Sequence, residues 1–574
     1  TAPAPARILA RFLLRERCDA PRSRPGVPGA RERALSRRAS GSIGIRRRAG
    51  YDGALCHRRS RHGASMSDPT PSPLFPDLTR ALDAAPRDAS GVAFFDLDRT
   101  LVDGYSIVAF LHEALRAGLV APGRILEQAR AVLEEGQGGL GPLIERLVGT
   151  LRGERDATLE ALGERAFRRQ VAGRIHPEAR ALIRAHRGRG HRVVVLSSAT
   201  RYQVEPVARA LGIPPRDVLC TRLVLDDAGR LTGRWKLPGC WNEGKRLHAR
   251  AWLRRNGGSF ENAWFYTDSH EDVALLERVG HPVVVNPDGA LARRATAEDW
   301  PVLRFRRRRP GLESVVRTGL TLSSVYGSLA AGAATLALGG RWREAVDVSL
   351  STFGHLGLAF GGVRLRVTGE HHLLGARPAV VVFNHQSALD GLIVARLLRG
   401  EFSGVCKREL AGNPVLGPAL RAAGMVFVDR DSARGSARAL GPALEALRDG
   451  RSLAIAPEGT RSASVRPGPF HRGAFYLARR ARVPIVPVVI HNSADVLPRG
   501  GLFLRGDVPV QVTVLPPLQA AHWHAGDLAR HAAALQHRYL RLLGFAWESA
   551  PAADGAPAAQ AEVYDWPEAM PIAV

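Results

Sequence analysis

Two aspartates at alternate positions close an apolar run near residue 95. In FFDLDRTLVDG, Asp96 and Asp98 end what we expect to be a buried strand. Side chains two residues apart leave a strand on the same face, so both carboxyl groups can act on one phosphate. One carboxylate can attack phosphorus to form an aspartyl-phosphate, while the other protonates the leaving oxygen and then activates water. The pair alone is weak evidence, because aspartates at strand ends often cap turns.

Further polar residues follow the next apolar runs. Ser197, or its neighbour Ser198, ends VVVLSSAT and offers a hydroxyl and backbone N–H groups to a phosphate. Lys245, one of only three lysines in the chain, can neutralise phosphoryl oxygens. YTDSHED adds carboxylates of the kind that Mg²⁺ prefers. The set predicts a magnesium-dependent phosphatase site, with metal ligands Asp96, Asp98, Asp268 and Asp272.

This ordered set resembles the haloacid dehalogenase superfamily over about residues 90–300, and most closely its phosphoserine-phosphatase-like branch. The resemblance implies a Rossmann-like α/β domain with a helical cap, here about residues 105–187, and Mg²⁺ as cofactor. It also implies Asp96 as nucleophile and Asp98 as acid/base, with Ser197 and Lys245 on the phosphate. VDGYSIVAF lacks the acidic residue that phosphoserine enzymes place after their first motif, so phosphoserine is not the expected substrate.

A second set of residues lies in the C-terminal half. His385 and Asp390, in NHQSALD, follow the apolar run AVVVF. Five residues along a regular helix would separate their side chains by about 140°. The pair can meet only if the chain bends after His385 and Asp390 lies in the first turn of a helix. There the carboxylate can orient the imidazole while the imidazole deprotonates an attacking hydroxyl.

Arginines and a glycine loop accompany this pair. Arg430 ends VFVDR, and APEGTRS forms a tight loop after an apolar strand, with Glu458, Gly459, Thr460 and Arg461. Two arginines beside a glycine loop suit bidentate binding of a phosphate monoester. Lys407 either adds to this site or is a solvated charge at a strand end, and the sequence leaves both readings open.

NHQSALD, VFVDR, PEGTRS and VPIVPV, in this order, resemble the glycerol-phosphate and lysophosphatidate acyltransferase family over about residues 310–545, and its lysophosphatidate branch most closely. The resemblance implies an α/β glycerolipid acyltransferase domain in which His385 is the general base and Asp390 its partner. Around the glycerol phosphate it places Arg430, Glu458, Gly459 and Arg461. It further implies acyl-CoA or acyl-carrier-protein as donor and the membrane lipid lysophosphatidate as acceptor.

The elements that must position these residues alternate between apolar runs and helical stretches. In residues 90–300 the expected strands are GVAFFDLD, HRVVVLSS, AWFYTDS and HPVVVNP. In residues 364–545 they are AVVVFN, FSGVC, MVFVD, SLAIAP, PIVPVVI and PVQVTVL. Such alternation predicts two α/β domains, each with a mostly parallel sheet and with ligands at the carboxyl ends of its strands.

Charge is concentrated at the start of the chain. Residues 1–65 hold 16 Arg and 4 acidic residues and so supply 12 of the 27 net positive charges, without hydrophobic periodicity. A transit peptide has such a composition. We favour upstream translation or a mis-set start, because Met66 is the first of three methionines. The remainder lacks zinc-finger spacing or a recognition-helix pattern, so we expect no nucleic-acid partner. Anionic lipid and phosphorylated substrates account for its basic charge.

Residues 304–363 join the two domains. A basic run, RFRRRR at 304–309, precedes two apolar stretches at about 318–338 and 346–363 that are rich in Gly, Ala and Ser. Neither is a convincing transmembrane helix on hydropathy. Both domains need the cytosol, so the region either lies in the membrane interface or makes a two-pass hairpin, and we favour interfacial helices. We therefore expect a peripheral or monotopic protein on the cytoplasmic face of the inner or plasma membrane. The Ala/Pro-rich tail, 549–574, is expected to be disordered.

The sequence as a whole favours a bifunctional enzyme of phospholipid biosynthesis. It would form phosphatidate by acyl transfer and hydrolyse a phosphomonoester through an aspartyl-phosphate. The alternative is an acyltransferase with a non-catalytic, sensing phosphatase-like domain.

Overall fold

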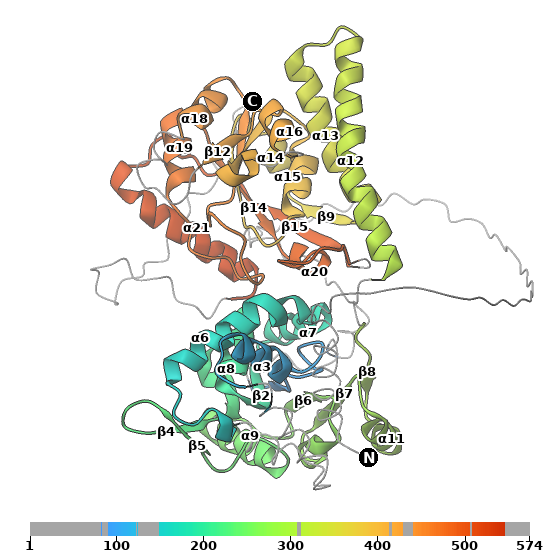
Figure 1. Ribbon diagram of the computed structural model, residues 1–574, viewed down its shortest axis with the longest axis vertical. Coiled ribbons are helices and arrows are strands. Elements are labelled where there is room, and N and C mark those ends of the chain that lie inside the picture. The colour runs from blue at the N-terminus through green and yellow to red at the C-terminus, as the bar shows by residue number, and fades with distance from the viewer. Residues whose placement is uncertain are drawn as a thin grey trace, which may run out of the picture.

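Two α/β domains follow one another along the chain (Figure 1). The computed structural model describes residues 82, 90–121, 123, 148–306, 311–412, 416–428, 440–505 and 508–545. The leader 1–65, the tail 549–574 and part of the basic run 304–309 lie outside these residues. The expected fold class is confirmed, since each domain is built on a sheet that is wholly or mostly parallel.

The first domain has a six-stranded parallel sheet in the order β3-β2-β1-β6-β7-β8. Its strands are β1 (Val92–Phe95), β2 (Arg192–Thr200), β3 (Val218–Thr221), β6 (Ala263–Thr267), β7 (His281–Val285) and β8 (Val302–Leu303). Ala93 and Phe95 enter one apolar core, and Val92 and Phe94 enter another on the opposite face. Burial of both faces explains why the strand is a continuous apolar run. The four expected strands are β1, β2, β6 and β7.

Helices cover both faces of this sheet. α7 (Pro177–Gly188) and α8 (Arg201–Ala210) contribute to the core that holds Phe95. The opposite core receives α9 (Glu243–Asn256), α10 (Val273–Leu276) and α11 (Gly289–Ala297). α3 (Ser106–Arg116) and α6 (Asp156–Ala166) form a separate apolar cluster with the hairpin of β4 (Leu223–Leu225) and β5 (Leu231–Trp235). The cap-like helices thus end before α7, which packs on the sheet although the cap was expected to reach residue 187.

The second domain has a seven-stranded sheet in the order β12-β11-β13-β10-β14-β15-β9. Its strands are β9 (Leu365–Thr368), β10 (Val380–Phe383), β11 (Phe402–Lys407), β12 (Val426–Val428), β13 (Ser452–Ile455), β14 (Ile485–Ile490) and β15 (Val510–Val514). Only β14 and β15 pair antiparallel among the pairs in this sheet that the structure describes. The six expected strands are β10 to β15, and β9 was not expected.

Helices also cover both faces of the second sheet. One core takes α18 (Gly441–Arg448), α19 (Gly473–Ala481) and α21 (Leu528–Leu542), and the other takes α13 (Trp342–Phe360), α14 (Glu370–Leu374) and α15 (Asp390–Leu398). α16 (Leu416–Ala422) precedes β12. A Cβ on Gly354 would lie 2.4 Å from the backbone nitrogen of Arg396, so glycine lets α13 lie directly against α15.

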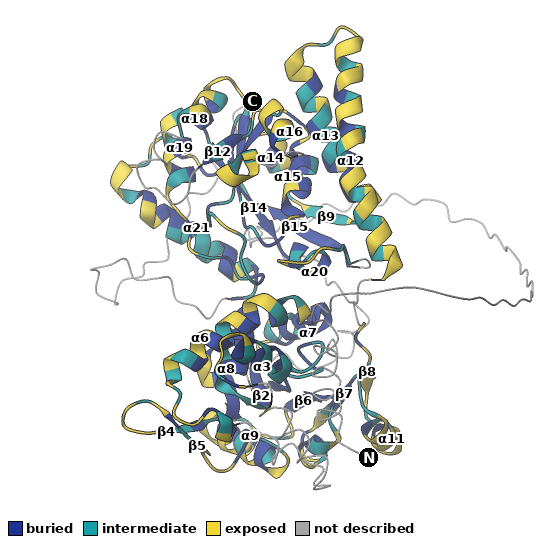
Figure 2. Cartoon of the chain, viewed as in Figure 1, coloured by how far each residue is buried: buried dark blue, intermediate teal, exposed yellow. Residues whose placement is uncertain are grey.

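α12 (Leu312–Ala337) forms a helical hairpin with α13 and is largely exposed (Figure 2). Its apolar residues Val315, Leu322, Tyr326, Leu329 and Leu336 recur at helical spacing and are all exposed. By length and composition, α12 is the one helix among the described residues that could cross a membrane. The sequence analysis judged the stretch at about 318–338 unconvincing as a membrane helix because it is rich in Gly, Ala and Ser, and the mean hydropathy of an 18-residue stretch of the helix, 1.2, is correspondingly modest.

Candidate active sites

Asp96 lies where β1 ends, between the ends of β2 and β6, and forms an ion pair with a buried lysine. Lys245, in the first turn of α9, places Nζ 2.9 Å from Oδ1 of Asp96 and 2.8 Å from Oδ2 of Asp272. Burial by itself would lower the pKa of Lys245, but the carboxylates of Asp272 and Asp96 outweigh burial and raise this pKa. A lysine held charged beside Asp96 can neutralise phosphoryl oxygens that approach this carboxylate.

Asp98 holds the start of the cap-like helices. Its Oδ1 accepts a hydrogen bond from the backbone N–H of Ser106 at 2.7 Å, and its Oδ2 accepts one from the Ser106 hydroxyl at 3.2 Å. Burial raises the pKa of Asp98 to about 7, although the bonds from Ser106 oppose this shift. A carboxyl group with such a pKa can exchange a proton near neutral pH, as an acid/base requires.

Asp268 follows β6 and pairs with an arginine that the sequence analysis did not select. Arg99 Nη1 lies 2.8 Å from Asp268 Oδ2, and Arg99 Nη2 donates to the backbone oxygen of Asn286 at 3.2 Å. Arg99 has a φ of +60°, in the left-handed region that side chains other than glycine rarely adopt. Its position directly after Asp98 in the motif was the available clue to Arg99.

All four predicted metal ligands are hydrogen-bonded or ion-paired within the protein, Asp96 with Lys245 and Asp268 with Arg99. Asp272 accepts hydrogen bonds from Lys245 and, at 2.5 Å, from the hydroxyl of Thr267, while Asp98 is bonded to Ser106. Among the described residues, no group of three or more His, Cys, Asp and Glu side chains is arranged to hold an ion. Mg²⁺ needs no such cage, because one or two carboxylates, waters and a substrate phosphate suffice. Asp96 and Asp268 would supply these carboxylates in exchange for their contacts with Lys245 and Arg99, and the full four-residue ligand set remains a prediction.

Ser197 lies near the carboxyl end of β2, the strand beside β1. Its side chain is buried, and its hydroxyl accepts a hydrogen bond from the backbone N–H of Ala199 at 3.2 Å. The backbone of Ser198 instead accepts a bond from Thr221. A role of Ser197 on phosphate remains a prediction.

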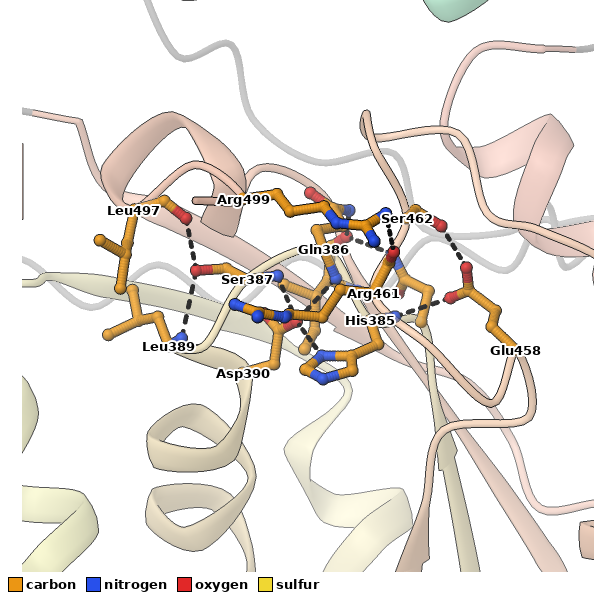
Figure 3. Close-up of polar contacts among 12 residues, drawn as sticks. His385, Gln386, Ser387, Leu389, Asp390, Glu458, Arg461, Ser462, Leu497 and Arg499 are labelled. Carbon is orange, nitrogen blue, oxygen red and sulfur yellow. Dashed lines mark hydrogen bonds and ion pairs between the residues drawn. The ribbon is translucent and has the colours of Figure 1, made fainter. Parts of the chain in front are cut away.

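In the second domain, β10 leads into a turn that brings His385 and Asp390 together (Figure 3). His385 Nδ1 lies 2.8 Å from Oδ2 of Asp390, the first residue of α15. The same oxygen accepts hydrogen bonds from the backbone N–H groups of Gln386 at 2.7 Å and Ser387 at 2.8 Å. The bend after His385 and the helix start at Asp390 are therefore confirmed. Asp390 is fully buried, whereas the His385 side chain is 26% exposed and can meet a substrate.

Glu458, from the loop after β13, supports this turn from the other side (Figure 3). Its carboxylate accepts hydrogen bonds from the backbone N–H of His385 at 2.7 Å, from that of Gly468 at 2.8 Å and from the Ser462 hydroxyl. Burial raises the pKa of Glu458, and these bonds oppose the shift. Ser462 N also donates to the backbone oxygen of His385 at 2.8 Å. The observed contacts make Glu458 a brace for the turn, and its place at the glycerol phosphate remains a prediction.

The same loop carries Gly459, Thr460 and Arg461. Gly459 has a φ of +70°, which explains the glycine, and Thr460 is exposed. Arg461 extends toward the His385–Asp390 pair in Figure 3. Its backbone oxygen accepts a hydrogen bond at 2.7 Å from Arg499, a residue that the sequence analysis did not select.

Two further cations, Arg430 and Lys407, were considered for this site. Arg430 lies outside the described residues. Lys407 pairs with Glu409 at 2.5 Å, and both side chains are at least half exposed. This contact favours the reading of Lys407 as a solvated charge at a strand end.

Comparison with known proteins assigns both domains. The family model described as haloacid dehalogenase-like hydrolase matches residues 93–277, and the model described as acyltransferase matches residues 364–491. A Mycobacterium tuberculosis protein named "Probable phosphatase" is 33% identical over 264 residues, which are 44% of this chain and 90% of that protein. The chain belongs to the haloacid dehalogenase-like hydrolases and carries an acyltransferase domain.

Two further relatives bear on the two halves of this hydrolase–acyltransferase chain. Histidinol-phosphatase of Neisseria meningitidis is 31% identical over 221 residues, which are 38% of this chain and 99% of that protein. Human 1-acyl-sn-glycerol-3-phosphate acyltransferase alpha is 36% identical over 182 residues, which are 31% of this chain. The chain spans 63% of the length of this human relative. Asp96, Lys245 and Asp268 of the hydrolase domain, and His385 and Asp390 of the acyltransferase domain, lie inside the matched ranges.

Proposed function

We propose that the acyltransferase domain transfers an acyl group from acyl-CoA or acyl-carrier-protein to lysophosphatidate and forms phosphatidate. The observation that carries the proposal is the 2.8 Å contact between His385 Nδ1 and Asp390 Oδ2. An imidazole that donates from Nδ1 presents the lone pair of Nε2, which can take the proton of the acceptor hydroxyl. The hydroxyl oxygen then bonds to the thioester carbonyl carbon, the carbon–sulfur bond breaks, and the proton passes to the thiolate.

The acceptor class rests on Arg461 and on the relatives. A guanidinium binds a phosphate monoester through two parallel hydrogen bonds, so Arg461, in the loop that braces the catalytic turn, suits an acceptor with a terminal phosphate. The human relative is named for 1-acylglycerol-3-phosphate, which is lysophosphatidate. Both observations favour this acceptor over an uncharged alcohol.

The hydrolase domain, in this proposal, cleaves a small phosphomonoester. Asp96 attacks phosphorus, Asp98 gives its proton to the leaving oxygen, and the deprotonated Asp98 then activates water against the aspartyl-phosphate. Lys245 holds Asp96 and Asp272 in place, with Nζ within 2.9 Å of each carboxylate. Asp96 and Asp268 would hold Mg²⁺, which supplies positive charge for the phosphoryl oxygens when it is bound.

A second candidate retains acyl transfer and gives the hydrolase domain only a sensing role. The observation that favours it is the pairing of Asp268 with Arg99, at 2.8 Å, which places a protein cation on a carboxylate assigned to Mg²⁺. A domain whose carboxylates are neutralised by its own arginine and lysine could bind a phosphorylated compound without turning it over.

Membrane association follows from the lipid acceptor and from α12. The exposed apolar face of α12 suits the boundary between headgroups and acyl chains, and α13 ties this helix to α15 and thus to the catalytic domain. We favour a peripheral or monotopic arrangement on the cytoplasmic face of the inner or plasma membrane, because the hairpin that α12 forms is packed on the catalytic domain. Alkaline carbonate should release a peripheral protein from membranes, whereas a monotopic or spanning protein, held by buried apolar surface, should need detergent.

The proposal is tested with the purified full-length protein in detergent. Given lysophosphatidate with acyl-CoA, and separately with acyl-carrier-protein thioesters, the protein should form phosphatidate and release one thiol per product. A panel of phosphomonoesters that includes histidinol phosphate should release inorganic phosphate when Mg²⁺ is present. Acyl transfer without any phosphate release above the background of Asp96→Asn would favour the sensing alternative. Absence of acyl transfer with every donor and acceptor would refute the main proposal.

A further inference from the structure

Residues 493–499, here called the bridging segment, lie between the hydrolase domain and the catalytic turn of the acyltransferase domain. The segment comprises α20 (Ser493–Val496) and the three residues that follow it. Figure 1 places α20 beside α7 across the boundary between the domains. Contacts on both sides of this segment link the hydrolase domain to the catalytic turn of the acyltransferase domain.

On the hydrolase side, the segment makes a buried ion pair. Arg180 of α7 directs Nη1 at Oδ1 of Asp495, and the two side chains are only 7% and 3% exposed. Pro498 lies against Gly173, where a Cβ would come within 3.0 Å of the proline ring. A buried charge that loses its partner is strongly unfavourable, so Arg180 and Asp495 hold each other in a defined place.

On the acyltransferase side, the same segment holds both catalytic loops. The backbone oxygen of Leu497, two residues after Asp495, accepts a hydrogen bond from the Ser387 hydroxyl at 2.6 Å. Arg499 Nη1 donates to the backbone oxygen of Arg461 at 2.7 Å. Ser387 belongs to the catalytic turn, and Arg461 belongs to the loop that braces it, so a shift of the bridging segment would move both (Figure 3).

A second contact connects the bracing loop to the hydrolase domain directly. Ala463, which follows Ser462, packs against the apolar core that contains Phe95 of β1. Ser462 in turn donates its backbone N–H to the backbone oxygen of His385 at 2.8 Å. The hydrolase domain thus touches the two sides of the acyltransferase site, at Asp495 and at Ala463.

We propose that Arg180 of the hydrolase domain is a positioning residue for acyl transfer, acting through Asp495 and the bridging segment on the catalytic turn. The inference rests on the proposed acyl transfer at His385. Arg180 touches neither substrate; it fixes Asp495 so that Leu497 and Arg499 hold Ser387 and Arg461. Phosphate chemistry at Asp96 plays no part, so the hydrolase domain serves as a scaffold for its neighbour even when its own site is inactive.

Two single variants and their combination test the pair in the full-length protein. Arg180→Met keeps an unbranched side chain but removes the ion pair with Asp495, which is then left with the neighbouring charge of Arg184, and Asp495→Asn removes the partner charge. A misplacement of about 1 Å can cost ~10²-fold in rate, so each variant should lower acyl-transfer kcat by ~10- to 100-fold. Phosphatase turnover should stay within about twofold of the unmodified protein. Because both changes break one interaction, the double variant should be no slower than the slower single variant. Effects that multiply would overturn the proposal.

Arg187→Met is the matched control. Arg187 also lies on α7 and donates across the domain boundary, to the backbone oxygen of Gly544 at 2.7 Å, but not to the bridging segment. This variant should keep acyl transfer within about twofold. An equal loss in Arg187→Met and Arg180→Met would mean that docking in general, and not the bridging segment, supports the site. If Arg180→Met does not fold, Arg180→Lys, which keeps the charge with fewer hydrogen bonds, should show a loss of kcat smaller than that of Asp495→Asn, and a larger loss would overturn the proposal.

Hydrogen exchange provides a readout that does not depend on activity. The backbone N–H groups of Gln386 and Ser387 are bonded to Asp390, at 2.7 and 2.8 Å. In Arg180→Met, peptides that cover residues 384–390 should exchange faster, while peptides from β1 and β6 should not change. Unchanged exchange at 384–390 would overturn the inference, even if the unmodified protein showed no acyl transfer and the proposed function itself had failed.

Discussion

Replacing Asp390 by asparagine removes the negative charge from the catalytic turn and keeps an oxygen that can accept hydrogen bonds. In the structure, Oδ2 of Asp390 accepts from His385 Nδ1 at 2.8 Å, from Gln386 N at 2.7 Å and from Ser387 N at 2.8 Å. Among the described residues, the buried Oδ1 has no hydrogen-bond partner. One oxygen therefore holds both the imidazole and the backbone of the turn.

The expected cost follows from these three bonds. A hydrogen bond to a charged group contributes ~1.5–3 kcal/mol to stability and a neutral one ~0.5–1.5 kcal/mol, so three bonds that become neutral should cost ~3 kcal/mol. For a domain of this size such a loss lowers the melting temperature by ~6–12 °C. Catalysis should suffer more. The imidazolium that forms as His385 takes a proton has lost its anion, so much of the ~10²–10⁴-fold worth of general-base assistance should disappear.

Steady-state thiol release with lysophosphatidate as acceptor measures this loss, at a temperature where thermal melting shows the variant to be folded. Asp449→Asn is the matched control, because among the described residues the Asp449 side chain makes one exposed ion pair, with Arg343, on the surface of the same domain. The control should keep normal turnover and stability. A folded Asp390→Asn variant with kcat/KM within about threefold of the unmodified protein would refute the role given to the His385–Asp390 contact.

Three further changes separate the two sites. Asp96→Asn should lower phosphate release by several orders of magnitude and leave acyl transfer intact, because it removes the nucleophile without touching the bridging segment. Loss of both activities in a folded variant would contradict the view that the two sites work separately. Chelation with EDTA should stop phosphate release and spare acyl transfer, and addition of Mg²⁺ should restore it; metal-independent phosphatase turnover would exclude the assigned role of Asp268. Arg461→Ala should raise the KM for lysophosphatidate more than it lowers kcat, and the opposite pattern would remove Arg461 from the phosphate site.

The positions of most strands could be predicted from the sequence because both faces of each sheet are buried. Runs such as VAFF and VVVF are apolar at every position, as a short strand buried between two cores is expected to be. Strands without such runs were missed. β9 alternates half-buried and exposed residues, and β8 has only two residues, so neither carries the pattern.

Residues that the chemistry itself requires could be predicted from the sequence. Residues that support them from distant parts of the chain could not. The H-x-x-x-x-D spacing required a bend that the structure contains, and the accompanying motifs, through their resemblance to the acyltransferases, pointed to His385 and Asp390. Arg99 and Arg499 act through partners that are distant in sequence, Asp268 and Arg461, and no local pattern reports such pairs. The same holds for Glu458. Its motif was recognised, but its hydrogen bond from the backbone N–H of His385 could not be predicted from the sequence.

The role of His385 as the base of acyl transfer is tested most directly by the turnover of His385→Ala, measured together with binding of lysophosphatidate. Without a base the acceptor hydroxyl must attack as a neutral alcohol, so kcat should fall by ~10²–10⁴-fold while lipid-phosphate binding persists. Near-normal turnover in a folded His385→Ala protein would contradict the mechanism, however closely the surrounding residues match those of other acyltransferases.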